Sequence, residues 1–219
     1  MMYDYSQLSN FLLDGDHQKV WDYIKNHGDL SQLEIYQNMI TPAMHHIGYL
    51  WENNKITVAD EHLATATCDF VLSRLAYEPS VKPAKRDTRF KAMFLCLEEE
   101  QHYLGLKMAN SLFKENDWDT KYFGPNLPLE YALKSAKEWK PHVIGLSVSI
   151  VYHLPKLRNY TNEFSKLSNQ PVVLLGGRLT ENYDLRPYCS PQTIIMKNLP
   201  EMKQWLHEYP SEEKLDAIF

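Results

Sequence analysis

The sequence predicts an α/β protein in two parts: an N-terminal four-helix bundle and a Rossmann-like (flavodoxin-like), doubly wound, five-stranded parallel sheet. Three observations predict this fold class. Apolar residues recur at helical spacing up to about residue 78. From residue 90 onward strand and helix patterns alternate, which is the order that builds a parallel sheet. Between them, residues 79–89 hold two prolines and a basic cluster without periodicity. We therefore assign 1–78 to the bundle, 79–89 to a linker and 90–219 to the sheet domain.

Four helices are expected in the bundle. The first carries the apolar stripe Tyr5–Leu12, and the second follows Asp16, a good N-cap residue. The third begins with a capping box, Ser31–Glu34, and contains Pro42, which is expected to kink it. The fourth begins at Thr57. The loops between these helices are short, as in a small antiparallel bundle.

The second part alternates between the two patterns. Strands are expected at residues 92–97, 118–123, 143–149, 171–175 and 193–196, and helices at about 106–115, 129–139, 154–167 and 200–207. The run 92–97 is apolar throughout, which favours a central strand buried on both faces. The second strand has the polar composition of an edge strand. Repeated βα units imply a doubly wound sheet, whose ligands bind beyond the carboxyl ends of its strands.

Polar residues follow the central strand at the position where such a ligand is expected. In an extended chain residues two apart face the same way, so Glu100 and His102 are predicted to lie side by side. A carboxylate beside an imidazole selects its tautomer and turns the other nitrogen outward, as it does for metal-ligating histidines. Gly105, without a side chain, lets a broad group approach the backbone. A solvated surface histidine is the alternative interpretation of His102.

Small residues end the next two central strands, and they extend this prediction. Ser147 and Ser149 end one strand, and Gly176 and Gly177 follow the other. Such residues commonly do no more than end strands. At the carboxyl edge they are also expected to leave a slot that admits a long group.

The segment Glu100–Gly105 resembles the Asp-x-His-x-x-Gly loop of cobalamin-binding domains, with glutamate in place of aspartate. The serines and the glycine pair resemble that family's serine and Gly-Gly signatures. The resemblance implies that His102 binds cobalt from below. It also implies that Ser147, Ser149, Gly176 and Gly177 line the channel for the cofactor's dimethylbenzimidazole tail, in the base-off, histidine-on state.

A second resemblance lies in the bundle. Gly48–Trp51 and Ile56–His62 are similar to the helical cap of light- and cobalamin-sensing regulators and of some corrinoid proteins. In that family a tryptophan and a Glu-His pair face the upper side of the corrin, which implies this role for Trp51, Glu61 and His62. The residues also allow a purely structural interpretation, with Trp51 in the core and Glu61 near a helix N-terminus.

The chain departs from the light-sensing repressors in two respects. Glu52 stands where their cobalt-binding histidine follows the lid tryptophan, and a carboxylate is a poor substitute for imidazole on cobalt(III). Light sensing by that route is therefore not expected. His45 and His46 lie upstream on the same helix, where surface or packing roles are expected. No DNA-binding module is recognised, so we expect no direct contact with nucleic acid.

Composition limits the other possibilities. Twenty-three basic and 28 acidic residues give a formal net charge of −5, which does not favour a nucleic-acid surface. Cys68, Cys96 and Cys189 are widely separated and are typical of reduced thiols in a cytoplasm. No leader and no apolar run long enough to span a bilayer are recognised. We expect a cytoplasmic protein without a membrane partner.

The leading hypothesis is a cobalamin-binding regulatory protein that acts through a protein partner rather than by binding DNA itself. Its cofactor would be adenosyl-, methyl- or hydroxocobalamin, and copies could pair through the bundle. The alternative is a corrinoid methyl carrier for a separate methyltransferase. A phosphoreceiver is a third possibility, because Glu98 and Glu99 imitate an acidic magnesium site. A receiver, however, needs an aspartate where this chain has Ser147 and Ser149.

Overall fold

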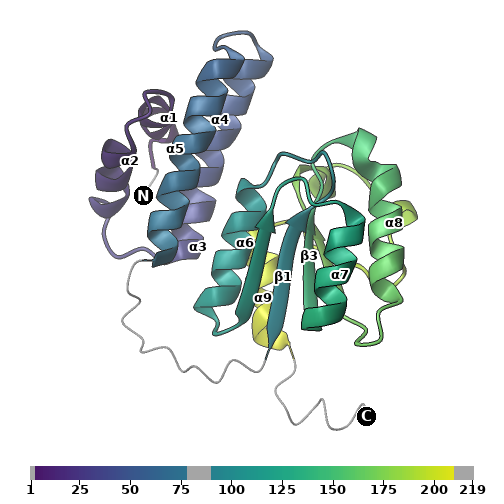
Figure 1. Cartoon of the computed structure of the whole chain (residues 1–219). Coiled ribbons are helices and arrows are strands. Elements are labelled where there is room, and N and C mark those ends of the chain that lie inside the picture. The colour runs from purple at the N-terminus through teal and green to yellow at the C-terminus, as the bar shows by residue number, and fades with distance from the viewer. Residues whose placement is uncertain (1–2, 78–89, 210–219) are drawn as a thin grey trace. The chain divides into compact units, whose positions relative to one another are not determined.

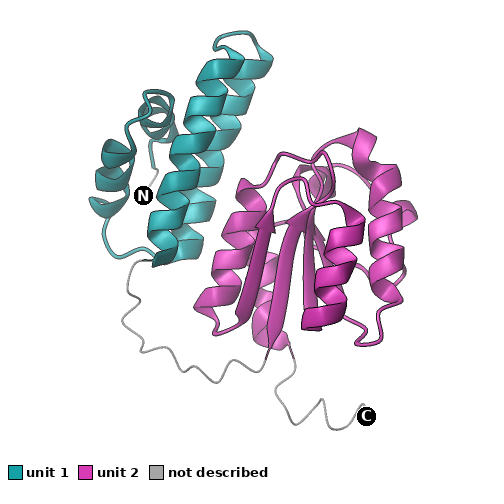
Figure 2. Ribbon diagram, viewed as in Figure 1, with its two compact units in different colours: residues 1–83 teal, residues 84–219 magenta. Residues whose placement is uncertain are grey.

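The structure, a computed structural model, describes residues 3–77 and 90–209 (Figure 1). Its internal contacts divide the chain into two compact units, residues 1–83 and residues 84–219 (Figure 2). The predicted linker, 79–89, lies outside the described residues. Among the described residues, none of the helices has both the length and the hydropathy needed to traverse a bilayer.

The first unit is helical throughout its described elements. They are α1 (Tyr5–Leu13), α2 (His17–Lys25), α3 (Gln32–Ile35), a π-helical turn (Tyr36–Ile40), α4 (Thr41–Glu52) and α5 (Val58–Tyr77). Asp16 caps α2 by accepting a hydrogen bond from the Lys19 amide at 3.0 Å. Ser31 and Glu34 form the predicted capping box at the start of α3. Since the π turn joins α3 to α4 without a break, the unit is a bundle of four helical rods, as predicted.

The π turn explains how the third rod continues past its proline. Pro42 has no amide hydrogen, and its ring would collide with a carbonyl of the preceding α-helical turn. Immediately before it, the Thr41 amide donates to the Tyr36 carbonyl five residues back. This wider turn accommodates the proline within the helix. The sequence correctly locates a disturbance at Pro42, and the disturbance takes the form of a π turn.

The bundle core is formed by the apolar stripes that the sequence predicts. Its large, almost completely buried side chains include Leu8, Leu12, Ile24, Tyr36, Met39, Ile40, Ile47 and Leu72. Complete burial of one such side chain stabilises a fold by roughly 1.5–3 kcal/mol. These contacts hold the unit together without any disulfide, because all three cysteines of the chain are free thiols.

The second unit is a parallel sheet covered by helices on both faces. Its elements are β1 (Lys91–Cys96), α6 (Leu104–Glu115), β2 (Asp119–Gly124), α7 (Leu129–Trp139), β3 (Val143–Ser147), α8 (Leu154–Ser165), β4 (Val172–Gly176), β5 (Ile194–Ile195) and α9 (Leu199–Glu208). The five described strands are all parallel, in the order β2-β1-β3-β4-β5, so β2 is an edge strand as predicted. Helices α6 and α9 cover one face and α7 and α8 the other (Figure 1). This is a doubly wound, Rossmann-like fold.

Burial on both faces accounts for the continuous apolar run of β1. On one face Met93 and Leu95 belong to the cluster that includes Leu157 of α8. On the other face the Phe94 ring packs edge-on against Phe113 of α6, with 4.9 Å between ring centroids. A strand covered in this way needs apolar side chains at every position.

Strand register brings three chain segments to one edge. Cys96 at the end of β1 pairs with Ser147 of β3, and Ser147 pairs with Gly176 of β4. The chain runs from β1 to β2 on one side and later to β3 on the other, so a topological switch point lies beside β1. In doubly wound sheets the crevice at this point receives ligands.

Candidate functional site

The loop after β1 places Glu100 and His102 together by a route that the sequence analysis did not foresee. The chain does not stay extended: residues 98 and 99 form a turn, and Glu99 has a positive φ of 70°. The Glu100 amide closes this turn by donating to the Leu97 carbonyl at 3.0 Å. The turn precedes Glu100, and beyond it the predicted pairing of Glu100 with His102 is present.

The Glu100 side chain is the centre of this site. It is completely buried, and its carboxylate accepts four hydrogen bonds. Oε1 accepts from the His102 amide at 3.0 Å and from His102 Nδ1 at 2.6 Å. Oε2 accepts from the Ser149 amide at 2.7 Å and from His153 Nδ1 at 3.1 Å. Two carboxylate oxygens offer about four lone-pair positions, and the described donors fill them.

These donors keep Glu100 charged in spite of its burial. Burial by itself raises the pKa of this carboxyl group. The hydrogen bonds from the His102 side chain, the Ser149 and His102 amides and His153 outweigh it and lower the pKa to about 2. The site therefore contains an ionised carboxylate from weakly acidic pH upward.

An ionised carboxylate determines the form of the His102 ring. A carboxylate only accepts hydrogen bonds, so Nδ1 of His102 must carry the hydrogen, and the lone pair of the neutral ring lies on Nε2. The side chain is 58% exposed. Its backbone is held as well, because the Cys96 thiol and the Ser147 hydroxyl both donate to the His102 carbonyl, at 3.7 and 3.5 Å. This arrangement suits an imidazole that ligates a metal through Nε2.

The serines contribute differently from the expectation. β3 ends at Ser147, two residues earlier than predicted, and Ser149 lies in the following loop. Ser147 is buried, and its hydroxyl positions the His102 loop. Ser149 contacts Glu100 through its backbone amide, a contact that does not depend on its side chain.

The two glycines at the end of β4 also differ from each other: Gly176 is its last residue and Gly177 follows it. A Cβ at Gly176 would meet nothing within 4 Å, so space is open there. A Cβ at Gly177 would lie 2.2 Å from the Val148 carbonyl oxygen, and its φ of +114° is one that side-chain-bearing residues rarely adopt. Space is therefore open beside Gly176, whereas backbone packing fills the space beside Gly177.

We expect Gly177→Ala to lower the free energy of unfolding by about 2 kcal/mol, because it combines an unfavourable φ with a collision against a backbone carbonyl. The matched variant Gly176→Ala should change it by less than about 1 kcal/mol. Urea unfolding of both proteins, followed by circular dichroism, checks this. Equal unfolding midpoints for the two variants would contradict the difference in free space between Gly176 and Gly177.

Sequence reasoning missed the residues that support the loop from outside. The Asn126 side chain accepts from the Glu99 amide at 2.8 Å. The Tyr160 hydroxyl accepts from the Glu98 amide at 3.1 Å and donates to the Leu127 carbonyl at 2.6 Å. His153, only 7% exposed, reaches Glu100 from the start of α8. Nothing in the local sequence distinguishes these three from ordinary helix and loop residues.

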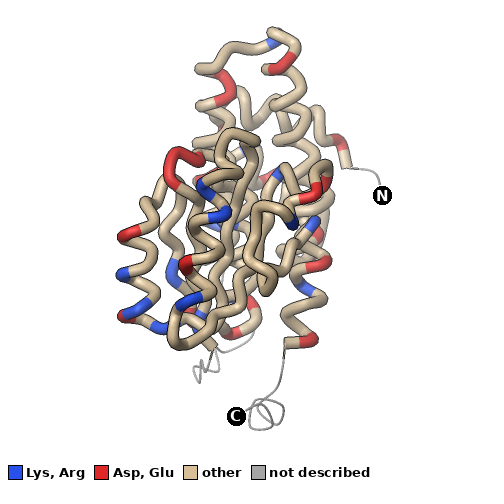
Figure 3. Tube along the Cα trace, turned by 90° about the vertical axis from the view of Figure 1, so that its right-hand side faces the viewer, with Lys and Arg blue, Asp and Glu red and all other residues tan. Residues whose placement is uncertain are grey.

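The two remaining acids of the loop are engaged by one lysine. Lys156 Nζ lies 2.7 Å from a Glu99 oxygen and 4.0 Å from a Glu98 oxygen. Elsewhere acidic and basic positions are interspersed along the helices of the second unit, whereas acidic positions predominate in the described residues of the first (Figure 3). Among residues 3–77 and 90–209, no group of three or more His, Cys, Asp or Glu side chains could hold a metal ion by itself.

In the bundle the structure places Trp51 on the surface, with 49% of the residue exposed. The alternative of a core tryptophan is therefore wrong. His62 Nδ1 lies 2.8 Å from a Glu61 oxygen, and the other Glu61 oxygen accepts from the Thr65 hydroxyl at 2.8 Å. The His62 side chain is 74% exposed. The indole and the imidazole oriented by Glu61 are thus both exposed on the surface of the bundle.

The two histidines of α4 occupy the places that the sequence predicts. His45 is exposed. His46 is half-buried, and its ring lies edge-on to Tyr5 with 5.6 Å between centroids. Glu52, which replaces the light-sensing family's histidine, is exposed at the end of α4.

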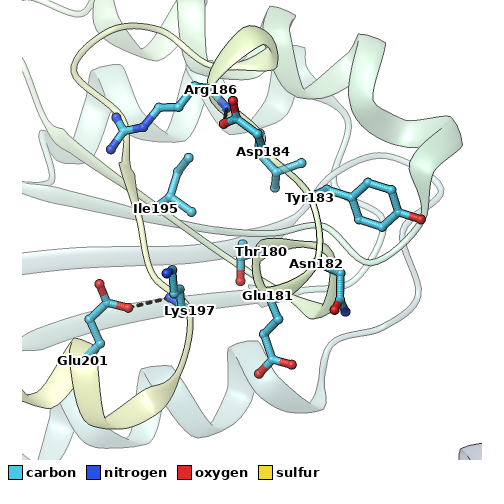
Figure 4. A pocket seen from close by; sticks show the side chains of 10 residues that line it. Thr180, Glu181, Asn182, Tyr183, Asp184, Arg186, Ile195, Lys197 and Glu201 are labelled. Carbon is cyan, nitrogen blue, oxygen red and sulfur yellow. Dashed lines mark hydrogen bonds between the residues drawn. The ribbon is translucent and has the colours of Figure 1, made fainter.

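A separate cavity of about 530 Å³ lies near the β5 edge of the sheet (Figure 4). Its walls carry charges of both signs: Glu181, Asp184 and Glu201 against Arg186 and Lys197. Two of the carboxylates accept hydrogen bonds from the backbone of the cavity wall. The Lys197 amide donates to Glu201, and the Arg186 amide donates to Asp184. None of the predicted site residues lines this cavity.

Comparison with known families identifies both units. A family model described as "B12 binding domain" matches residues 90–187, and a second model with the same description matches residues 5–76. The "HTH-type transcriptional repressor CarH" of Myxococcus xanthus is 26% identical over 118 residues, which are 54% of this chain and 38% of that protein. The chain thus spans well under half the length of this relative.

Solved structures share the architecture of the whole chain. The monomethylamine corrinoid protein of Methanosarcina barkeri superposes with a TM-score of 0.72 at 14% identity, covering 95% of this chain and 98% of that one. The methanol:cobalamin methyltransferase complex MtaBC from Methanosarcina barkeri gives a TM-score of 0.50 at 11% identity, covering 100% and 86%. At these identities the likeness is one of fold.

Proposed function

Because the chain is a cobalamin-binding-domain protein in which both units match B12-binding models, we propose that it is a regulatory module that reports the state of bound cobalamin to a protein partner. The observation that carries this proposal is in the bundle. An exposed indole, Trp51, and an imidazole oriented by Glu61 are available to contact the cofactor's upper ligand. The likeness to a transcriptional repressor supports a regulatory role.

The residues after β1 fit cobalamin. We propose that His102 is the lower axial ligand through Nε2, with Glu100 holding its ring. A Cβ at Gly105 would meet nothing within 4 Å, and the same holds at Gly176, so both positions leave room for a bulky group. When bound, cobalamin supplies a cobalt ion whose upper ligand can be exchanged.

We propose that the remaining predicted residues shape the place of the cofactor's nucleotide tail. Ser149 and Gly176 would border it. Ser147 and Gly177 would act by fixing the strand ends, because Ser147 holds the His102 loop and Gly177 packs against the Val148 peptide. In the bundle, Trp51, Glu61 and His62 would contact the upper side.

The direct test is titration of the purified protein with hydroxo-, methyl- and adenosylcobalamin in the dark and after illumination. Absorption spectra report base-off, histidine-on binding, and light scattering reports the size of the particle. A regulatory module should change its size or its partner affinity between cofactor forms. A folded protein that retains no form of cobalamin would refute the proposal.

We expect Trp51→Ala to weaken adenosylcobalamin binding about 10-fold, since loss of indole contact area of this kind costs on the order of 1–2 kcal/mol. Hydroxocobalamin, with its small upper ligand, should bind nearly as before. Tyr77→Ala removes an aromatic residue that is 83% exposed in the same unit and serves as the control. An equal loss for both cofactor forms would show that Trp51 does not sense the upper ligand.

A methyl carrier for a separate methyltransferase is the second candidate. One observation favours it: the fold of the monomethylamine corrinoid protein matches 95% of this chain. Glu52 is compatible with it too, because a carrier needs no protein ligand above the cofactor. Transfer of a labelled methyl group from the loaded protein to a methyl acceptor, catalysed by a partner methyltransferase, would favour the carrier. Cofactor-dependent binding to a regulator without such transfer would favour the regulatory role.

A further inference from the structure

His153 belongs to none of the sequence motifs of this chain, yet it contacts the carboxylate at the centre of the site. It precedes α8 as its N-cap residue and is nearly buried. Its Nδ1 lies 3.1 Å from Glu100 Oε2, on the opposite side of the carboxylate from His102. Glu100 therefore joins two imidazoles that come from loops following different strands.

The chemistry of this contact resembles that of the His102 contact. Glu100 is ionised and can only accept, so the His153 ring must also donate through a hydrogen on Nδ1. The distances differ: 2.6 Å to His102 and 3.1 Å to His153. A shorter charge-assisted hydrogen bond is the stronger one, so Glu100 interacts mainly with His102, and His153 contributes a weaker, lateral contact.

This lateral contact restrains the carboxylate plane. The other donors to Glu100 are two backbone amides and the His102 ring itself. Among the described contacts, His153 is thus the side chain outside the β1 loop that holds Glu100. Without it, one buried lone pair of Oε2 loses its partner and the plane of the carboxylate is less constrained. The direction in which Oε1 faces His102 depends on that plane.

We propose that His153 is a positioning residue for the cofactor site: through Nδ1 it fixes Glu100, and Glu100 in turn holds the His102 ring with Nε2 directed toward the ligand. The contacts from His153 to Glu100 and from Glu100 to His102 are present in the structure. Their purpose, orientation of an axial ligand, rests on the proposed function.

Wild type and two variants of His153 test this proposal. His153→Leu keeps a buried apolar side chain and removes the donor. His153→Asn places an amide nitrogen near the position of Nδ1 and keeps the donor. The ring tautomer of His102 is measured by ¹⁵N NMR without cofactor, and affinity for hydroxocobalamin is measured by absorption titration. Unfolding midpoints are recorded for all three proteins.

We expect wild type to show the Nδ1–H tautomer for both His102 and His153. His153→Leu should give a mixture of His102 tautomers and bind hydroxocobalamin at least 10-fold more weakly, the lower limit for loss of an outer-shell partner. His153→Asn should keep the single tautomer and remain within about threefold of wild-type affinity. A purely structural role would lower the unfolding midpoint and leave the tautomer of the folded protein unchanged.

Several results would overturn the proposal. One is a folded His153→Leu variant with wild-type tautomer and affinity, and another is an equal loss in the Leu and Asn variants. Should the Leu variant not fold, an Nε2–H tautomer of His153 in wild type would refute the donor role without any substitution. If wild type does not bind cobalamin through His102, the proposed function fails, while the NMR result still decides whether His153 orients that ring.

Discussion

His102→Ala is expected to bind hydroxocobalamin about 100-fold more weakly than wild type and to lose the histidine-on absorption spectrum. Loss of an outer-shell partner alone costs 10–100-fold in metal affinity, and here the proposed ligand itself is removed. The fold should survive, because the side chain is 58% exposed and the loop keeps the hydrogen bonds to its backbone. Absorption titration and a gel-filtration retention assay measure the effect.

The matched control is His207→Ala, which removes an exposed histidine from α9 in the same unit. It should bind the cofactor like wild type. Unfolding curves should show that both variants are folded. An unchanged spectrum in His102→Ala would remove this residue as the axial ligand, and the proposed site with it.

Glu100→Gln is expected to lower the free energy of unfolding at neutral pH by about 3 kcal/mol. In the folded wild-type protein the pKa of the Glu100 carboxyl group is about 2, against an ordinary value of 4.5. Each unit of this difference corresponds to about 1.4 kcal/mol of stability. The neutral amide cannot reproduce the contacts, because its NH₂ group would face two N–H donors. Urea unfolding at pH 7 measures the loss.

The pH dependence gives a second measurement of the same group. Since the folded-state pKa is lowered, the carboxylate stabilises the fold above the unfolded-state pKa of about 4.5, and this contribution is lost as the pH falls toward 2. Between pH 5 and pH 3, wild type should therefore lose about 2 kcal/mol more stability than Glu100→Gln. The control Glu115→Gln changes an exposed acid and should follow wild type. Parallel curves for wild type and Glu100→Gln would contradict the lowered pKa.

Much of the architecture could be predicted because it depends on local periodicity. The capping box at Ser31 and the π turn just before Pro42 lie where the sequence places a helix start and a disturbed helix. The parallel sheet follows from the alternation of apolar strands and amphipathic helices, and burial on both faces explains why β1 is apolar from Ala92 onward. Element ends were less predictable: β3 stops at Ser147 because pairing, which a single strand does not reveal, ends there.

The residues of the candidate site also divide into those that could be predicted from the sequence and those that could not. Glu100, His102 and Gly105 could be named from their order after a central strand, and cobalamin from their resemblance to a known loop. Trp51 could be named but not placed, since an exposed and a buried indole are equally compatible with its neighbours in sequence. His153 could not be named at all: it is 53 residues away from Glu100, and only the packing of α8 brings it to the carboxylate.

By itself, then, the sequence determined the two-part fold, the strand whose end carries the candidate site, and the imidazole that we propose as the cobalt ligand. Local patterns suffice for these, because hydrophobic periodicity indicates the secondary structure and the alternation of strands and helices indicates a parallel sheet. The tertiary structure alone decided how that imidazole is held. A buried carboxylate stays ionised only where donors from separate segments meet, and in this chain that meeting is brought about by the turn at Glu99, the Ser149 amide and His153.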